Sequence, residues 1–405
     1  MKCAKRRAAR AAARVAVADA IEMRPTTYSL LLLFLSFSAF AGVLPEDRID
    51  VLYHRYDGGG VKVDGPSVLI RKKLNESVAL NANYYVDMVT SASIDVQMIS
   101  GASQYKERRV QRSIGADWLR GKTTYTASYI NSDEGDYIAD TMNLGISEDM
   151  FGDLTTVSLG YSRGWDKVGR NVNHHLDPAF GQKNADHQSW RVGLSQILTK
   201  HLITGLNFEV QTSEGYLQNP YRQVRVCDLP PPNCTDYTLE PEVYPHTHTT
   251  NAASVDARYF LPYRAALHGN YRYGHDTWGI GSHTFELEYV HPWRSWTFEV
   301  GGRYYAQNAA DFYADIFPFS RSQNFEARDR NLSDFASYSG HLGVTYDFKL
   351  PWSWLHGLSI NLFGDYIQYK YNDFRNPLDR SLTPFEQPLY DVNAYVVRFF
   401  VAGYL

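Results

Sequence analysis

The stretch LITGLNFEVQT (residues 202–212) decides the fold class, because its apolar side chains recur at every second position. One face carries Leu202, Thr204, Leu206, Phe208 and Val210, and the other carries Ile203, Gly205, Asn207, Glu209 and Gln211. A period of two is typical of a β-strand with one apolar and one polar face. A second sheet or a helix covers the apolar face in a soluble protein. In a membrane barrel lipid covers it, and the polar face looks inward.

The same alternation recurs along the chain, and residues 42–405 contain no convincing amphipathic helix. It is found in TTVSLGYS (155–162), HTFELEYV (283–290), WTFEVGGRYY (296–305) and YSGHLGVTYDF (338–348). Of the 405 residues 44% are hydrophobic, 21% charged and 14% aromatic. This composition is too polar for a helical membrane protein and too aromatic for a typical soluble enzyme. The sequence therefore predicts an all-β chain.

The connections between these strands alternate between short and long. The short ones lie at 120–122, 148–153, 199–201, 262–264, 291–295 and 349–357. The moderate or long ones lie at 132–136, 163–186, 214–250, 275–281, 306–336 and 371–390. Bacterial outer-membrane barrels have short periplasmic turns and longer outer loops, whereas a soluble sandwich has no reason to alternate. Five of the eight tryptophans also lie beside short turns, where a periplasmic aromatic girdle is expected: Trp118, Trp293, Trp296, Trp352 and Trp354.

Counting the strands predicts a transmembrane antiparallel β-barrel of about 16 strands, within a range of 14–18. We expect three strands at 49–56, 67–74 and 78–87, and residues 88–110 as an outer or inward-folded loop. If 93–99 were also a strand, the first segment would drop out to keep the count even. The remaining strands are expected at 111–119, 123–131, 137–147, 155–163, 187–198, 202–213, 251–261, 265–274, 282–290, 296–305, 337–348, 358–370 and 392–405.

The N-terminal segment indicates export. Residues 23–41 combine Arg24, an apolar run of about 11 residues and the small-x-small site Ala39-Phe40-Ala41, as in a secretory signal peptide. A membrane anchor is the alternative, but it needs about 20 apolar residues. Residues 1–22 are interpreted as an artefactual extension before a true start at Met23, or as a long charged leader. The mature chain, 42–405, is then one barrel domain in the Gram-negative outer membrane.

The charge of the mature chain argues against nucleic-acid binding. Removing residues 1–41 leaves 40 − 7 = 33 basic and 44 − 2 = 42 acidic residues, a formal charge of −9. The expected partners are outer-membrane lipid, the barrel-assembly machinery and a periplasmic component. No cofactor is expected. Cys227 and Cys234 bracket three prolines, and in an exported protein they predict a disulfide that closes a loop. A metal-binding cysteine pair is the less favoured alternative.

Several stretches resemble a known family. They include YINSDEGDYIADT, FGDLTTVSLGYSRGWDKVGRN, GYLQNPYRQVR, LPYRAALHGNYRYGHDTWGIGSHTFELEYV and RYYAQNAADFY. They are similar to an uncharacterised family of Gram-negative exported proteins, the domain-of-unknown-function family numbered three-five-seven-zero. The resemblance runs from about residue 45 to the C-terminus. It implies an outer-membrane β-barrel and carries over no catalytic or ligand residues.

The polar faces of the strands predict a lumen with charges of both signs. A barrel of this size can hold an aqueous channel. Facing charges would orient polar solutes by a transverse field. The alternative is a network of ion pairs that fills the lumen, with Glu286 or Glu288 pairing with Arg272 and Arg303. The lumen-lining candidates are Arg191, Glu209, Asp256, Arg258, Arg272, Glu286, Glu288, Glu299, Arg303, His341 and Asp365.

The sequence thus favours a channel or uptake protein for polar small solutes. A non-conducting barrel that scaffolds a periplasmic or surface partner, such as a redox or lipoprotein component, is the second hypothesis. A surface hydrolase is a third, with His201, Ser213 and Asp256 as one of many conceivable triples. No G-x-S-x-G motif supports it, so we expect no enzyme. His174, His175, His246 and His248 are weak metal-ligand candidates in the outer loops, and we expect no metal.

Overall fold

The chain forms a closed barrel of 16 antiparallel strands, in which the last strand pairs with the first. The computed structural model describes residues 43–405 except 91–105, 173–174, 231–232, 353 and 379–380. The predicted signal peptide, and most of the predicted loop 88–110, lie outside the described residues. None of the helices in the described part of the chain is long and apolar enough to cross a membrane.

The strands follow one another around the wall in chain order. The barrel consists of β1 (Arg48–Gly58), β2 (Val61–Lys73), β3 (Val78–Thr90), β4 (Lys106–Arg120), β5 (Thr123–Asp133), β6 (Tyr137–Met150), β7 (Thr155–Val168), β10 (Lys183–Thr199), β11 (Leu202–Gly215), β14 (Thr247–Phe260), β15 (Ala266–Asp276), β16 (Gly281–Trp293), β17 (Trp296–Gln307), β18 (Phe335–Lys349), β19 (Gly357–Arg375) and β20 (Leu389–Tyr404). The outer loops carry two small hairpins that the sequence did not predict, β8 (Asn171–Val172) with β9 (His175–Leu176) and β12 (Gln223–Cys227) with β13 (Tyr237–Pro241), and the short helix η2 (Arg330–Leu332).

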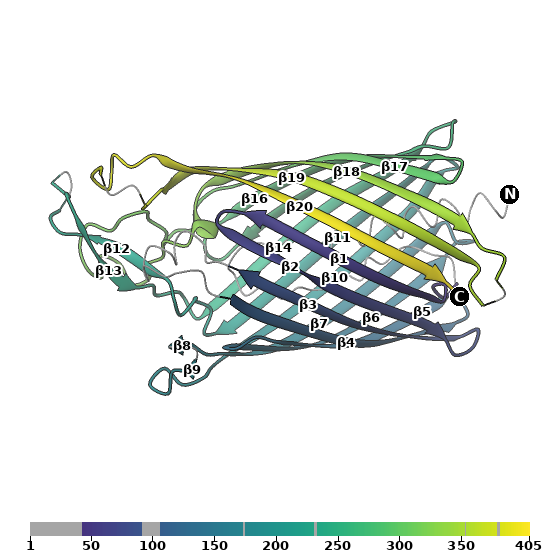
Figure 1. The fold of residues 1–405 in the computed structure, drawn as a ribbon, viewed down its shortest axis with the longest axis horizontal. Helices are drawn as coiled ribbons and strands as arrows, with labels where there is room; N and C mark the ends of the chain where they lie inside the picture. Colours follow the sequence, from purple (N-terminus) through teal and green to yellow (C-terminus); the bar gives the residue numbers. More distant parts are fainter. Residues whose placement is uncertain (1–42, 91–105, 173–174, 231–232, 353, 379–380) are drawn as a thin grey trace.

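The two ends of the barrel differ as the alternation of connections predicted. Short turns gather at the end where the chain terminus C lies, and the longer loops extend from the other end (Figure 1). The first hairpin is an exception, because its connection at the outer end is short. The strands predicted at 49–56 and 67–74 left residues 57–66 as a loop, but β1 continues to Gly58 and β2 begins at Val61. Gly59 and Gly60 alone make the turn, with φ of 60° and 80°. Positive φ at both central residues is the requirement of a type I′ hairpin turn, which glycine meets without strain.

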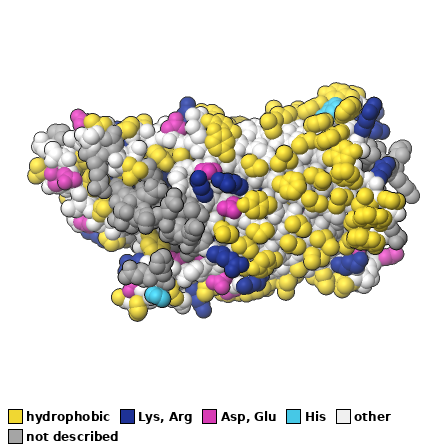
Figure 2. All heavy atoms as spheres, in the orientation of Figure 1, with side chains coloured by type: hydrophobic (Ala, Val, Ile, Leu, Met, Phe, Trp, Pro, Cys, Tyr) yellow, Lys and Arg dark blue, Asp and Glu magenta, His cyan; other side chains and the backbone are white. Residues whose placement is uncertain are grey.

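An apolar band surrounds the barrel wall. Hydrophobic side chains cover the wall in the view of Figure 2, and charged groups border them at both ends. Phe208 is 58% exposed, and Leu206 and Val210 beside it are exposed as well. The five tryptophans predicted for the girdle are also exposed. Large apolar side chains on this scale need an apolar covering, and on a closed barrel that covering is lipid.

Candidate functional site in the lumen wall and outer cap

The predicted lumen-lining residues lie on the face opposite this apolar band. Successive side chains of a strand point to opposite faces, so Glu209, between the exposed Phe208 and Val210, points inward. The same alternation places the other candidates inside: Arg191, Asp256, Arg258, Arg272, Glu286, Glu288, Glu299, Arg303, His341 and Asp365. The exposed neighbours that fix the outward face of these strands are Trp190, Val255, Tyr273, Phe285, Leu287, Phe298, Leu342 and Tyr366.

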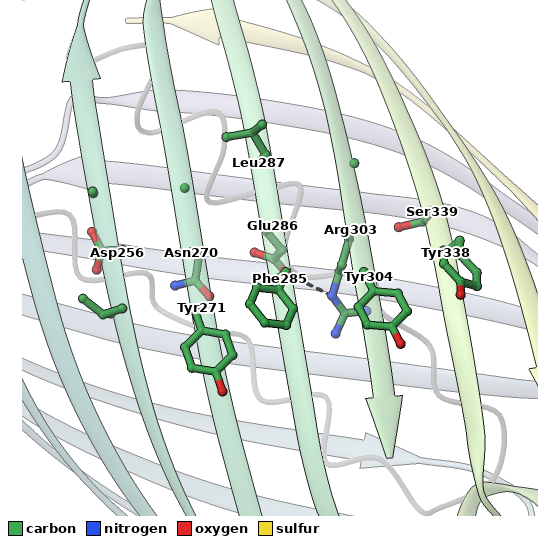
Figure 3. Close-up of a pocket in the computed structure, with 14 residues that line it drawn as sticks. Asp256, Asn270, Tyr271, Phe285, Glu286, Leu287, Arg303, Tyr304, Tyr338 and Ser339 are labelled. Carbon is green, nitrogen blue, oxygen red and sulfur yellow. Dashed lines mark ion pairs between the residues drawn. The ribbon is translucent and has the colours of Figure 1, made fainter. Parts of the chain in front are cut away.

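Several of these charges pair across the strands. Arg303 Nε lies 2.9 Å from a Glu286 oxygen, as Figure 3 shows. Arg191 Nε lies 2.9 Å from Glu209, and Arg272 Nη2 lies 3.2 Å from the same carboxylate. Glu209 is therefore a partner of Arg272 that the sequence analysis did not consider, whereas the pair of Glu286 with Arg303 was predicted.

The partner of Arg272 is set by the small residues of β14. Ser254 lies opposite Arg272, and Ala252 lies opposite Glu209. Because the side chains of Ser254 and Ala252 are small, they do not fill the space between β11 and β15. The long guanidinium side chain can then reach across β14 to the second strand away. Glu288 instead lies beside His268, with 3.8 Å between Oε2 and Nδ1.

Further charged residues inside the barrel escaped the sequence analysis. Arg398 lies 2.7 Å from Asp365, whose other oxygen is 2.6 Å from His341 Nδ1. On another part of the wall, His54 Nε2 lies 2.8 Å from Asp87. The alternation of the sequence could have identified both residues as inward-facing. Arg398 lies between the exposed Val397 and Phe399, and His54 lies next to the exposed Tyr53.

The charged wall has an accessible part and a buried part. The side chains of Arg272 and Glu286 remain 40% and 36% exposed although they point inward. Glu299 and Arg398, toward β20, are buried. Inward charges that keep a third of their surface indicate open space beside β15 and β16 within the described part of the barrel.

A pocket in this region opens on the outer surface of the wall. Fourteen residues of β14–β18 line it (Figure 3). Tyr271, Phe285, Tyr304 and Tyr338 form a row across four strands, with ring centroids 4.6–6.4 Å apart between neighbours. Phe285 and Tyr338 belong to the exposed apolar band, so the row faces lipid and does not line the lumen.

Three loops pack together at the outer end of the barrel, and we call them the outer cap. They are residues 216–246, 308–334 and 376–388. The Cys227 N–H donates to Phe317 O at 2.9 Å, and Val243 pairs with Glu326. The Tyr221 hydroxyl also donates to Asp136 of the β5–β6 turn, so the cap contacts the rim beyond β10 and β7. Its largest apolar cluster comprises Tyr244, Ala310, Phe312, Ala327 and Leu332, together with Trp278 of the β15–β16 turn.

Two buried arginines share one carboxylate at the centre of the cap. Asp315 pairs with Arg225, and its other oxygen lies 2.9 Å from Arg328 Nη2. Arg225 also donates to Gln387 Oε1 at 2.6 Å, which connects all three loops. Burial lowers the pKa of Arg225, and the neighbouring Arg328 adds to this effect. The cap is therefore held by ionic contacts as well as by apolar packing.

Glu242 makes the stability of the cap depend on pH. Burial raises the pKa of this carboxyl to about 7, against the lowering effect of Arg222. Because the pKa is raised on folding, the folded cap binds a proton more tightly than the unfolded loop. The contribution of Glu242 to stability is fully present below about pH 4.5 and is lost as pH rises through about 7.

We expect hydrogen exchange of the cap to be slower at pH 5.5 than at pH 8, after correction for intrinsic exchange. The Arg328 amide, which donates to Glu242 Oε1 at 2.7 Å, is a suitable reporter. Glu242→Gln keeps an acceptor for that amide and should flatten the pH dependence. Equal protection at both pH values in the natural chain would contradict this expectation.

The structure forms the predicted disulfide, and the described histidines among the weak metal-ligand candidates make other contacts. Cys227 and Cys234 are bonded, at the base of the loop that they bracket. His246 Nδ1 contacts Gly215 O, and His248 Nε2 contacts Asp276. His175 lies apart in β9, and His174 lies outside the described residues. The described residues hold one group with metal-ligand geometry, and it consists of Glu288, Glu299 and His341.

The triple proposed for a hydrolase does not form. His201 lies in the turn before β11 and Ser213 near the other end of that strand, so about 40 Å separates them. Ser213 Oγ instead contacts His187 Nδ1 at 2.8 Å, and His187 Nε2 lies 3.2 Å from Asp166. Ser213 is paired with strands on both sides, so its backbone lies inside the sheet.

Comparison with solved structures returns outer-membrane proteins at low similarity. A structure described as "Bacterial polysaccharide outer membrane secretin" has 9% identity and a TM-score of 0.48, covering 90% of this chain and 99% of its own. CdiB from Acinetobacter baumannii has 9% identity and a TM-score of 0.46, covering 88% of this chain and 60% of its own. OmpT of Vibrio cholerae has 10% identity and a TM-score of 0.40, covering 90% and 100%. At these values the likeness says nothing about activity.

Comparison at the level of sequence gives a family. No curated protein matches the chain. The family model described as "Protein of unknown function (DUF3570)" matches residues 100–368, more than half of the 405 residues. The chain therefore belongs to this family of proteins of unknown function.

Proposed function

We propose that this protein is a channel or uptake protein for polar small solutes in the Gram-negative outer membrane. The observation that supports it most strongly is the inward wall of β11–β17, where charges of both signs keep accessible surface. A barrel of 16 strands is wide enough for an aqueous channel. Facing charges would align dipolar or zwitterionic solutes as they pass.

The proposal includes no enzymatic activity, and the partners are those of a barrel in a lipid bilayer. Outer-membrane lipid would cover the apolar band. The barrel-assembly machinery would insert the chain after export, and a periplasmic component could deliver or receive solute at the end with short turns. The acidic mature chain argues against nucleic acid as a partner.

Conductance in a planar lipid bilayer tests the channel. We expect the folded protein to give reproducible conductance steps, with Glu286→Gln shifting ion selectivity toward anions and Arg272→Gln shifting it toward cations. Both shifts should shrink at 1 M salt, where the screening length falls to about 3 Å. Phe285→Leu, which changes the neighbouring lipid-facing side chain, is the matched control and should leave selectivity unchanged. A folded, inserted protein that never conducts would refute the proposal.

A non-conducting barrel that scaffolds a periplasmic or surface partner is the second candidate. The ion pairs inside the barrel and the packed cap favour it, because both occupy space that a solute would need. This candidate expects silent bilayers together with co-purification of a partner from native membranes.

A further inference from the structure

Glu288, Glu299 and His341 bring three potential metal ligands together in the lumen wall. They come from three neighbouring strands, β16, β17 and β18, and one ligand atom of each lies within 4.8 Å of the others. Two ligands of a zinc ion, at about 2.0–2.2 Å from the metal, lie at most about 4 Å apart. Small side-chain rotations would therefore close this group around one ion.

The backbone register explains why these side chains meet. Gly301 of β17 lies between Glu288 on one side and His341 on the other. A Cβ at Gly301 would lie 3.6 Å from Cα and Cβ of Glu288, in the space between the two strands. Without that side chain, Glu288 and His341 can approach across β17. Glu299 lies two residues before Gly301 on the same inward face and supplies the third corner.

The orientation of His341 is an independent indication of a ligand. Its Nδ1 lies 2.6 Å from Asp365 Oδ1, and Arg398 holds the second oxygen of that carboxylate at 2.7 Å. Phe363 stacks on the ring with 5.5 Å between centroids. In the neutral ring with Nδ1 donating to Asp365, Nε2 carries the lone pair, and this atom is buried without a hydrogen-bond partner among the described residues. A carboxylate behind a histidine is the usual support of a metal-binding imidazole.

The set of ligand atoms indicates the class of ion. His268 lies directly opposite Glu288 and close to its carboxylate, so a second imidazole adjoins the group. Calcium and magnesium prefer oxygen ligands alone, whereas imidazole with carboxylate suits first-row divalent ions such as Zn²⁺. A divalent cation would also offset the repulsion between Glu288 and the buried Glu299.

We propose that Glu288, Glu299 and His341 form a binding site for a first-row divalent metal ion in the lumen wall. Asp365 is a positioning residue that orients His341, and His268 adjoins the site beside Glu288. The site is distinct from the Glu286–Arg303 pair and does not depend on whether the barrel conducts.

Calorimetric titration of the full mature chain with Zn²⁺ tests the site. The protein should carry no oligohistidine tag and should be treated with chelator before titration. We expect one equivalent to bind, Asp365→Asn to weaken binding by about 10- to 100-fold, and Glu299→Gln and His341→Ala to weaken it at least as much. Co²⁺ provides a second readout, because its visible bands report nitrogen and oxygen ligation: they should persist in Asp365→Asn and vanish in His341→Ala.

Controls separate a site from loss of folding and from surface binding. Each variant must show the heat-modifiable mobility of the folded barrel. His283→Ala removes an imidazole from the other face of β16 and should leave Zn²⁺ affinity unchanged. The proposal is overturned if the natural chain binds no Zn²⁺ or if binding survives in both Glu299→Gln and His341→Ala. It is also overturned if His246→Ala, in the outer cap, or His248→Ala, at the start of β14, abolishes binding instead.

Discussion

Replacing Asp315 with alanine is expected to lower the free energy of unfolding of the outer cap by about 3–5 kcal/mol, the usual cost of removing one partner from a buried charge cluster. Asp315 is the carboxylate shared by Arg225 and Arg328, whose side chains are almost wholly buried. It also accepts from the Arg375 amide at 3.3 Å. Alanine would leave two guanidinium charges inside the cap without a counter-charge.

Native-state hydrogen exchange measures this effect in the cap alone. The Phe317 amide, which donates to Arg225 O at 2.8 Å, should lose protection, whereas amides of β5 should not change. Asp315→Asn keeps an acceptor but loses the charge, so we expect a smaller loss. Asp391→Ala removes an exposed carboxylate of β20 and serves as the control. Unchanged exchange in Asp315→Ala would mean that Gln387 and the carbonyl contacts suffice to stabilise the arginines.

An arginine at Phe208 is expected to destabilise the barrel by about 2–4 kcal/mol, the cost of a charged side chain on the lipid face near the bilayer midplane. Phe208 lies near the middle of β11 and is exposed on the apolar band. The guanidinium group would have to lose its hydration or bring water into the hydrocarbon core of the bilayer. The nearest carboxylate along the strand, Glu209, points to the opposite face of the sheet.

Urea titration of the protein in phospholipid vesicles measures the change, with folded protein followed by its mobility without heating. Asn207→Arg is the matched control, since the neighbouring side chain points into the lumen and should tolerate a charge. Equal losses in the two variants would contradict the assignment of lipid and lumen faces. The comparison therefore decides what covers the apolar face of the stretch LITGLNFEVQT.

The strand positions could be predicted because alternation is a local property of the chain. β11 was expected at 202–213 and spans Leu202–Gly215, and β5 was expected at 123–131 and spans Thr123–Asp133. Lipid on one side and water on the other impose the period of two on every strand. The prediction was wrong between β1 and β2, where Gly65 and Pro66 resemble a loop. Both lie inside β2, at a gap in its pairing with β3.

The sequence by itself determined which residues face lipid and which face the lumen, because that choice depends only on position along a strand. It also determined the disulfide, since Cys227 and Cys234 are close in the chain. Only the tertiary structure decided which inward charges meet. Arg272 reaches across β14 to Glu209, and Asp315 joins Arg225 from 90 residues away. Such contacts depend on strand register, on the closure of the barrel and on how the outer loops fold over it, none of which a local period encodes.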